Sequence, residues 1–200
     1  MKSTDLLMFV AVVAVLLATM NLVITINKIG DFKIFSGFVT DTGIANLTIT
    51  SNTQVNFSYD DFINWGSGYV PTATDNCELT TTGIMNCTGF STISDGFVIV
   101  NIGNEDVNLN LTSSKSAADF IGAGAVFQWN VSQNETGSCP SGLDIASWTT
   151  VSTTGVRACD NFTFLDNRDE LEIHLRIVIP NTAATDAKTV TITADAQTYI

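Results

Sequence analysis

An uninterrupted apolar run near the N-terminus constrains this chain more than any other feature. Residues 6–26 read LLMFVAVVAVLLATMNLVITI, and no charged residue occurs between Asp5 and Lys28. As an α-helix, residues 3–29 would be roughly 40 Å long, enough to cross an apolar bilayer core of about 30 Å. The run is apolar on every side, and a helix of that kind must be buried in lipid or in other protein. Its only polar residues are Thr19, Asn21 and Thr25.

Three interpretations of this run compete. A cleaved secretory signal has a basic start, a shorter apolar region and a cleavage site flanked by small residues. Here the run is long, the preceding residues are MKSTD, and no convincing A-x-A cleavage site follows it. The two remaining interpretations are a permanent membrane anchor and a helix that sits first in the membrane and is later buried among copies of itself in a filament.

Charge and composition exclude several function classes. The chain has 200 residues, a formal net charge of −12 and a sequence pI near 4.1. Eight basic residues cannot form much of a phosphate-binding patch, so no nucleic-acid partner is expected. Only 14% of residues are charged and 45% are hydrophobic, which argues against an intrinsically disordered chain. The single histidine, His174, leaves little material for a catalytic triad or a multi-histidine metal site, so we expect no enzyme, no metal and no cofactor.

After Gly30 the pattern changes to alternation between apolar and polar residues, which is typical of half-buried strands. The clearest example is residues 171–179, LEIHLRIVI. Further strands are expected at 32–40, 44–50, 55–59, 96–102, 107–111, 127–131 and 190–194, and residues 116–123 have the pattern of a short helical turn. Short strands separated by polar turns predict an antiparallel, immunoglobulin-like β-sandwich over residues 30–200. The predicted class is therefore α+β: an N-terminal helix over residues 1–29, then this all-β domain.

Four cysteines and a long loop indicate the compartment. No C-x-x-C pair occurs, and four cysteines allow three disulfide pairings, of which the sequential one is favoured by proximity. That pairing joins Cys77 to Cys87 and Cys139 to Cys159. Paired cysteines in an acidic β domain indicate an oxidising environment outside the cell, whereas buried free thiols in a cytosolic protein are the alternative. Residues 61–95 form a long stretch without strong alternation, which is expected to be functional or tied down.

The N-x-S/T pattern of N-linked glycosylation occurs more often than the content of Asn, Ser and Thr gives by chance. The acceptor residues are Asn46, Asn56, Asn86, Asn110, Asn130, Asn134 and Asn161. Several of them fall on the polar faces of predicted strands, where a glycan fits. We therefore expect N-linked glycans at these positions; the alternative is that polar strand faces are simply rich in Asn and Thr.

An apolar helix that ends near residue 29, followed directly by an all-β domain, resembles the archaeal type IV pilin and archaellin superfamily. The resemblance covers the architecture of the whole chain, and its sequence-specific part is confined to residues 1–29. It implies that the helices bundle into a filament core and the β domains form the sheath. In bacterial type IV pilins a Glu at position five of the mature chain neutralises the N-terminal amine of a neighbour. Asp5 stands at that position if Met1 is the mature N-terminus.

On this resemblance, the expected function is a structural subunit of an extracellular filament that serves adhesion or motility. The expected partners are further copies of the chain, and the membrane before assembly. Polymerisation and register are assigned to Asp5, Leu6, Phe9, Val13 and Leu16. The alternative is a monomeric, membrane-anchored surface domain that binds a partner or glycan, and a third hypothesis is a secreted β-sandwich enzyme.

The remaining acidic, histidine and aromatic residues that could form a binding or catalytic site are expected to have structural roles. Asp166, Asp169, Glu170 and Glu172 surround Arg168, but their spacing is not that of a calcium-binding loop, so a solvated turn is expected. Asp60 and Asp61 are expected at a strand end rather than as an acid–base pair, and His174 is expected on the surface. Trp65, Tyr69 and Trp148 are expected as core aromatics rather than as a sugar-binding surface.

Overall fold

The computed structural model describes residues 3–31, 47–58 and 62–199, with helix side chains described at residues 4 and 7–25. The chain divides into two compact units, residues 1–48 and residues 49–200.

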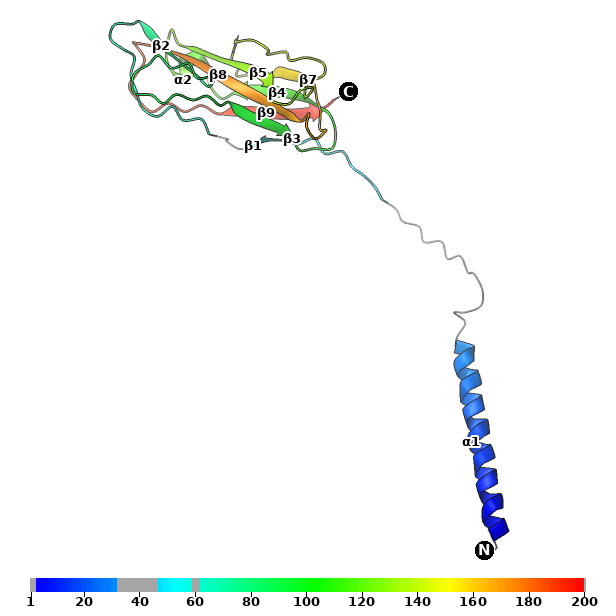
Figure 1. Ribbon diagram of the computed structural model, residues 1–200. Helices are drawn as coiled ribbons and strands as arrows, with labels where there is room; N and C mark the ends of the chain where they lie inside the picture. Colours follow the sequence, from blue (N-terminus) through cyan, green and yellow to red (C-terminus); the bar gives the residue numbers. More distant parts are fainter. Residues whose placement is uncertain (1–2, 32–46, 59–61, 200) are drawn as a thin grey trace. The chain divides into compact units, whose positions relative to one another are not determined.

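The first unit contains one long helix, α1 (Ser3–Asp31) (Figure 1). The apolar run predicted it, and the helix continues two residues past the expected end. Residues Leu7–Thr25 are long and apolar enough to cross a membrane by length and composition. The hydroxyls of Thr19 and Thr25 donate to the Leu16 and Asn21 carbonyls, so both polar side chains are satisfied inside the helix.

The second unit is an antiparallel β-sandwich, as predicted (Figure 1). One sheet has the order β1-β3-β8-β5-β6, with β2 also paired to β8, and the other has the order β7-β4-β9. The strands are β1 (Val55–Ser58), β2 (Asn76–Thr80), β3 (Phe97–Asn101), β4 (Val107–Ser113), β5 (Val126–Gln133), β6 (Thr149–Thr150), β7 (Val156–Phe162), β8 (Glu170–Pro180) and β9 (Ile192–Thr198). A short helix, α2 (Ala117–Phe120), comes after β4 and is capped by Ser116.

Strand β8 organises the larger sheet. It pairs with β5 along one edge, and on the other edge with β3 near its start and β2 near its end. Its odd-numbered residues from Leu171 to Ile177 are buried between the sheets, and its even-numbered residues face outward. The strict alternation of apolar and polar residues explains why this strand was the clearest in the sequence.

The core between the sheets is apolar and closed. Its largest fully buried side chains include Trp129 and Phe127 of β5 and Phe162 of β7. From the smaller sheet, β4 contributes Val107, Leu109 and Leu111 in strict alternation. The sandwich therefore has a core of its own, and every described residue of that core belongs to the second unit.

The structure corrects several strand predictions. Residues 47–50 form no strand, and the remainder of the predicted strands 32–40 and 44–50 lies outside the described residues. Three strands were missed, β2, β6 and β7. In β7 a register irregularity against β4 puts Ala158 and Cys159 in the core side by side, which destroys the alternation that reveals a strand. Strand β2 lies inside the 61–95 stretch, and β6 has only two residues.

Candidate functional site

The surface of α1 is the first candidate site. Phe9, Val13 and Leu16 lie four and three residues apart, so they share one side of the helix. Their exposed fractions are 65%, 38% and 63% in the single chain. Asp5 and Leu6 lie within the helical backbone, but their side chains lie outside the described residues.

Apolar exposure on α1 is not confined to that side. All described side chains from Leu7 to Thr25 are exposed, including those of Met8, Leu17 and Ile24 on other sides. Burying such side chains stabilises by about 1.5–3 kcal/mol each, so the helix has a strong drive to be covered by lipid or by protein. The main interaction that this surface offers is apolar association.

Two disulfides fix the β unit. They join Cys77 to Cys87 and Cys139 to Cys159, which is the pairing that proximity favours. Both need an oxidising compartment. A disulfide-bonded β unit together with an N-terminal apolar helix is typical of a secreted or membrane-anchored surface protein.

The 61–95 stretch is tied down at several points. It contains β2 and the Cys77–Cys87 disulfide, and backbone hydrogen bonds link Tyr69 to Thr88 in both directions. Of the three aromatic residues singled out in the sequence, Trp65 packs against the core and Trp148 is half-buried, whereas Tyr69 is exposed. The expectation of core aromatics is therefore confirmed for Trp65 and wrong for Tyr69, and Trp148 is not among the described residues that pack against the core.

The glycosylation acceptors differ in accessibility. Asn56, Asn86 and Asn134 are exposed, whereas Asn110 and Asn130 are half-buried at outward positions of β4 and β5. Asn161 is half-buried, and its side-chain oxygen is enclosed without a hydrogen-bond partner. Asn46 lies outside the described residues.

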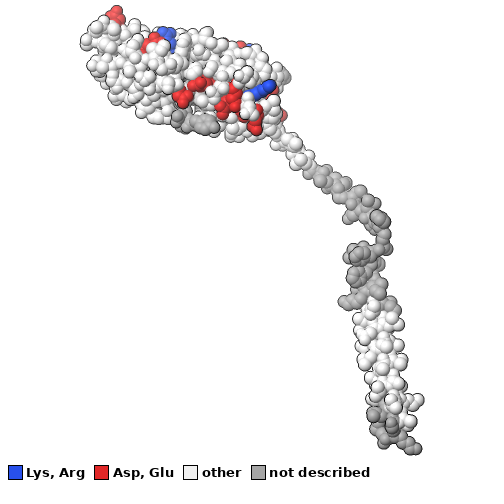
Figure 2. Space-filling view, in the orientation of Figure 1, with Lys and Arg blue, Asp and Glu red and all other residues white. Residues whose placement is uncertain are grey.

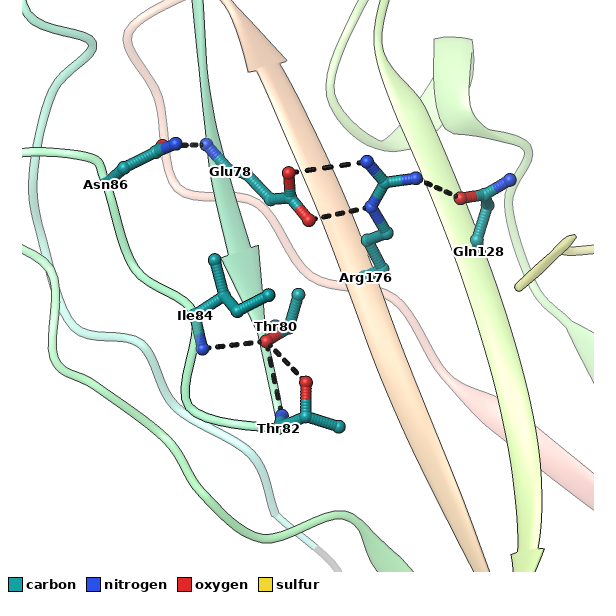
Figure 3. Close-up of polar contacts among 7 residues, drawn as sticks. All are labelled: Glu78, Thr80, Thr82, Ile84, Asn86, Gln128 and Arg176. Atoms are coloured by element: carbon teal, nitrogen blue, oxygen red, sulfur yellow. Dashed lines mark hydrogen bonds and ion pairs between the residues drawn. The ribbon is translucent and has the colours of Figure 1, made fainter. Parts of the chain in front are cut away.

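Asn86 is held in place by a polar network on the outer face of the larger sheet (Figure 3). Its side-chain oxygen accepts a hydrogen bond from the Glu78 backbone N–H, which leaves its amide nitrogen for a sugar. Arg176 Nε donates to Glu78 Oε1 at 2.7 Å, and Arg176 Nη1 donates to Gln128 Oε1 at 2.8 Å. This network crosses β2, β8 and β5, with β8 pairing to the strand on each side.

We expect glycan occupancy to reflect this order of accessibility. Mass spectrometry of peptides from the native protein should find Asn56, Asn86 and Asn134 modified and Asn161 unmodified, because an amide group whose oxygen is enclosed leaves little room for a bulky sugar. Asn86→Gln should remove one glycan from the intact mass, and Asn161→Gln should remove none. A glycan found on Asn161 but on none of the three exposed residues would contradict the prediction.

His174 differs from its expectation as a surface residue. Its side chain lies on the outer face of β8 but is only 16% exposed. Its Nε2 lies 3.3 Å from Ser132 Oγ and 3.5 Å from Glu172 Oε2, whereas Nδ1 is buried without a hydrogen-bond partner. In a catalytic triad the acid contacts the ring nitrogen opposite the nucleophile. Here both groups contact the same nitrogen, so the arrangement lacks the geometry of a triad.

The carboxylates near Arg168 make separate polar contacts. Among the described residues no group of three or more His, Cys, Asp or Glu side chains has metal-binding geometry. Glu172 accepts a hydrogen bond from the Gly96 N–H, and Glu170 accepts one from the Asn134 amide. Asp60 and Asp61 lie outside the described residues.

Asp169 contacts Glu135 across a large sequence distance. The Asp169 N–H donates to Glu135 Oε2 at 2.9 Å. Partial burial, and then hydrogen bonding with the Glu135 side chain, raise the pKa of the Asp169 carboxyl above its ordinary value of 3.8. Between the unfolded and folded pKa values the native state binds more protons than the unfolded chain, so stability falls as the pH rises through that window.

Asp169→Asn should therefore raise the melting temperature at pH 7. The rise should be small, at most about 2 °C, because the site is partly solvated. It should disappear near pH 3, where the wild-type carboxyl is itself protonated. Differential scanning calorimetry at both pH values checks this result, with Asp75→Asn at an exposed position as the control. A lower melting temperature at pH 7 for Asp169→Asn would refute this interpretation of the pair.

On the face of the β unit in Figure 2, acidic side chains cover more of the surface than basic ones, and most of that face is uncharged. Outside the first 48 residues the basic residues are Lys115, Arg157, Arg168, Arg176 and Lys188. Arg157 pairs with Asp144 and Asp160, Arg176 with Glu78, and Lys188 with Asp186. Because most cations are already paired, the unit presents net negative charge to solvent.

Comparison with protein-family models, with curated proteins and with solved structures gave no significant match. The architecture, an apolar helix joined to an antiparallel β domain, is consistent with that of pilins. The function of the chain must therefore be inferred from its residues and their geometry.

Proposed function

We propose that this chain is a structural subunit of an extracellular, archaeal type IV pilus-like filament. The observation that carries the proposal is the contrast between the two units. The sandwich has its own closed core, whereas α1 exposes apolar side chains on every side of residues Leu7–Thr25. A helix of this kind serves as the polymerisation element, and the disulfide-bonded sandwich serves as the glycosylated sheath.

The charge distribution supports this division of roles. A subunit with a net charge of −12 repels its copies, so contact between acidic sandwiches is unfavourable at low salt. No charged residue lies between Asp5 and Lys28, so helices can approach one another without that penalty. Head-to-tail addition by a rotation that does not close then generates an open helical filament.

Asp5 has a specific role in this proposal. A carboxylate beside a long apolar run is unfavourable in lipid, and pairing with the N-terminal amine of an incoming subunit would offset that penalty. The pairing would also set the axial register between subunits. Adhesion and motility are both served by filaments of this architecture.

The test is to shear intact cells, pellet the released material, and examine it by negative-stain electron microscopy and mass spectrometry. We expect thin, uniform filaments in which this chain is the main component. Protein that stays with the membrane, with none in any filament, would refute the proposal. That outcome would identify α1 as the anchor of a monomeric surface domain that binds a partner or glycan.

A further inference from the structure

Among the polar side chains of Leu7–Thr25, that of Asn21 differs from those of Thr19 and Thr25. The Thr19 and Thr25 hydroxyls donate to backbone carbonyls of their own helix. The Asn21 side-chain amide is exposed and makes no hydrogen bond with the described residues of the helix. It has two donors and one acceptor, and none of them has a partner within Leu7–Thr25.

An apolar environment cannot supply the missing partner. Asn21 lies four residues, about 6 Å, inside the end of the Leu7–Thr25 span. Neither lipid tails nor Leu, Val and Ile side chains offer a donor or acceptor at that depth, and an unpaired amide there is costly. The partner must be a polar group at the same level.

We propose that the Asn21 amide hydrogen-bonds with a polar side chain of a second copy of α1, and that the face carrying Asn21 is a helix–helix contact of the filament. The inference rests on the proposed function. It adds a specific residue and a specific face to that function. The polar side chains that a second copy offers at this depth are its own Thr19, Asn21 and Thr25.

The surroundings of Asn21 fit this contact. Ala11, Ala14 and Ala18 precede it at spacings of three, four and three residues, so all four residues share one side of the helix. Small residues let two helix backbones come close enough for an amide to bond across the interface. Ala18, three residues before Asn21, leaves room for such an approach beside the amide, whereas Leu17 borders it on the other side.

The opposite side of α1 is bulky. Phe9 and Val13 each lie two residues from Ala11, which places them about 200° around the helix. Leu7 and Leu17 lie on or beside the side that carries the alanines, so large apolar side chains surround α1 and close approach of two helices is easiest at the alanine positions.

The test compares Asn21→Leu with Thr19→Val in filaments reassembled from purified full-length protein. Each variant replaces a polar side chain with an apolar one of similar size, but within Leu7–Thr25 the Thr19 hydroxyl has a hydrogen-bond partner and the Asn21 amide has none. We expect Asn21→Leu to raise the critical concentration for assembly about 3- to 30-fold, which corresponds to about 0.6–2 kcal/mol. Thr19→Val should change it less than about twofold. Asn21→Gln, which keeps the amide, should recover part of the loss.

The direction in which Asn21→Leu shifts the critical concentration shows whether Asn21 contacts a polar group of a second helix or faces apolar surroundings. If Asn21 faces lipid-like surroundings, a leucine there makes the helix more apolar, and the critical concentration falls. A fall, or no change, would overturn the inference even though filaments form. A wild-type chain that forms no filament would instead refute the proposed function, so the two failures are distinguishable.

Discussion

Val13→Asp should abolish filament assembly while leaving the β unit folded. Val13 lies near the middle of the Leu7–Thr25 span, and its side chain is the least exposed of the large apolar residues described on α1. An aspartate at a helix centre costs about 2.5–3.5 kcal/mol on membrane-insertion scales, which is a factor of about 100 in equilibrium. We expect the critical concentration to rise by at least that factor.

The measurement uses purified protein, transferred from detergent into buffer at increasing concentrations and pelleted at each step. Val13→Leu is the matched control, because it changes size slightly and adds no charge. Circular dichroism should give the same melting temperature for the β unit in both variants, since none of the described residues of α1 belongs to its core. Filaments of Val13→Asp at the wild-type concentration would show that α1 is not the polymerisation element.

Removal of the Cys139–Cys159 disulfide should destabilise the β unit more than removal of the Cys77–Cys87 disulfide. The two residues are 20 positions apart, and both are buried. Cys139 lies in the segment between β5 and β6, and Cys159 lies in β7 of the smaller sheet, so the bond ties that segment to the smaller sheet. The chain-entropy account gives about 3 kcal/mol for a closed loop of this length.

For a unit of this size, that loss lowers the melting temperature by about 6–12 °C. Differential scanning calorimetry of the double variant Cys139→Ala, Cys159→Ala checks the value. The double variant Cys77→Ala, Cys87→Ala is the comparison, with a sequence separation of 10 residues inside the 61–95 stretch, and it should lose less. An unchanged melting temperature for the first variant would mean that packing and hydrogen bonds alone hold the β5–β6 segment on the sandwich.

The elements that could be predicted from the sequence are those whose signal is local. The apolar run predicted α1, and strict alternation predicted β8, because each pattern depends only on the residues of that element. Strand β7 was missed because its irregular pairing with β4 breaks the period of two. Strand β2 was missed because its five residues include buried Thr80, which carries no apolar signal.

For the candidate sites too, the sequence reveals local motifs but not features that depend on the fold. The glycosylation motifs are local, so the sequence finds them, but their accessibility depends on the fold. The Asn161 side-chain oxygen is enclosed only once β7 has paired and packed in the sandwich. The contact between Glu135 and Asp169 joins residues 34 positions apart, and no local pattern announces it. His174 is partly covered by neighbours from other strands, which explains why it was predicted as a surface residue.

Cryo-electron microscopy of the sheared filaments tests the central claim most directly, which is that α1 polymerises and the sandwich does not. We predict a core of parallel apolar helices, each formed by residues 3–31 of one subunit, inside a sheath of β-sandwiches. A filament held together by contacts between sandwiches, with the helices outside its core, would contradict this claim.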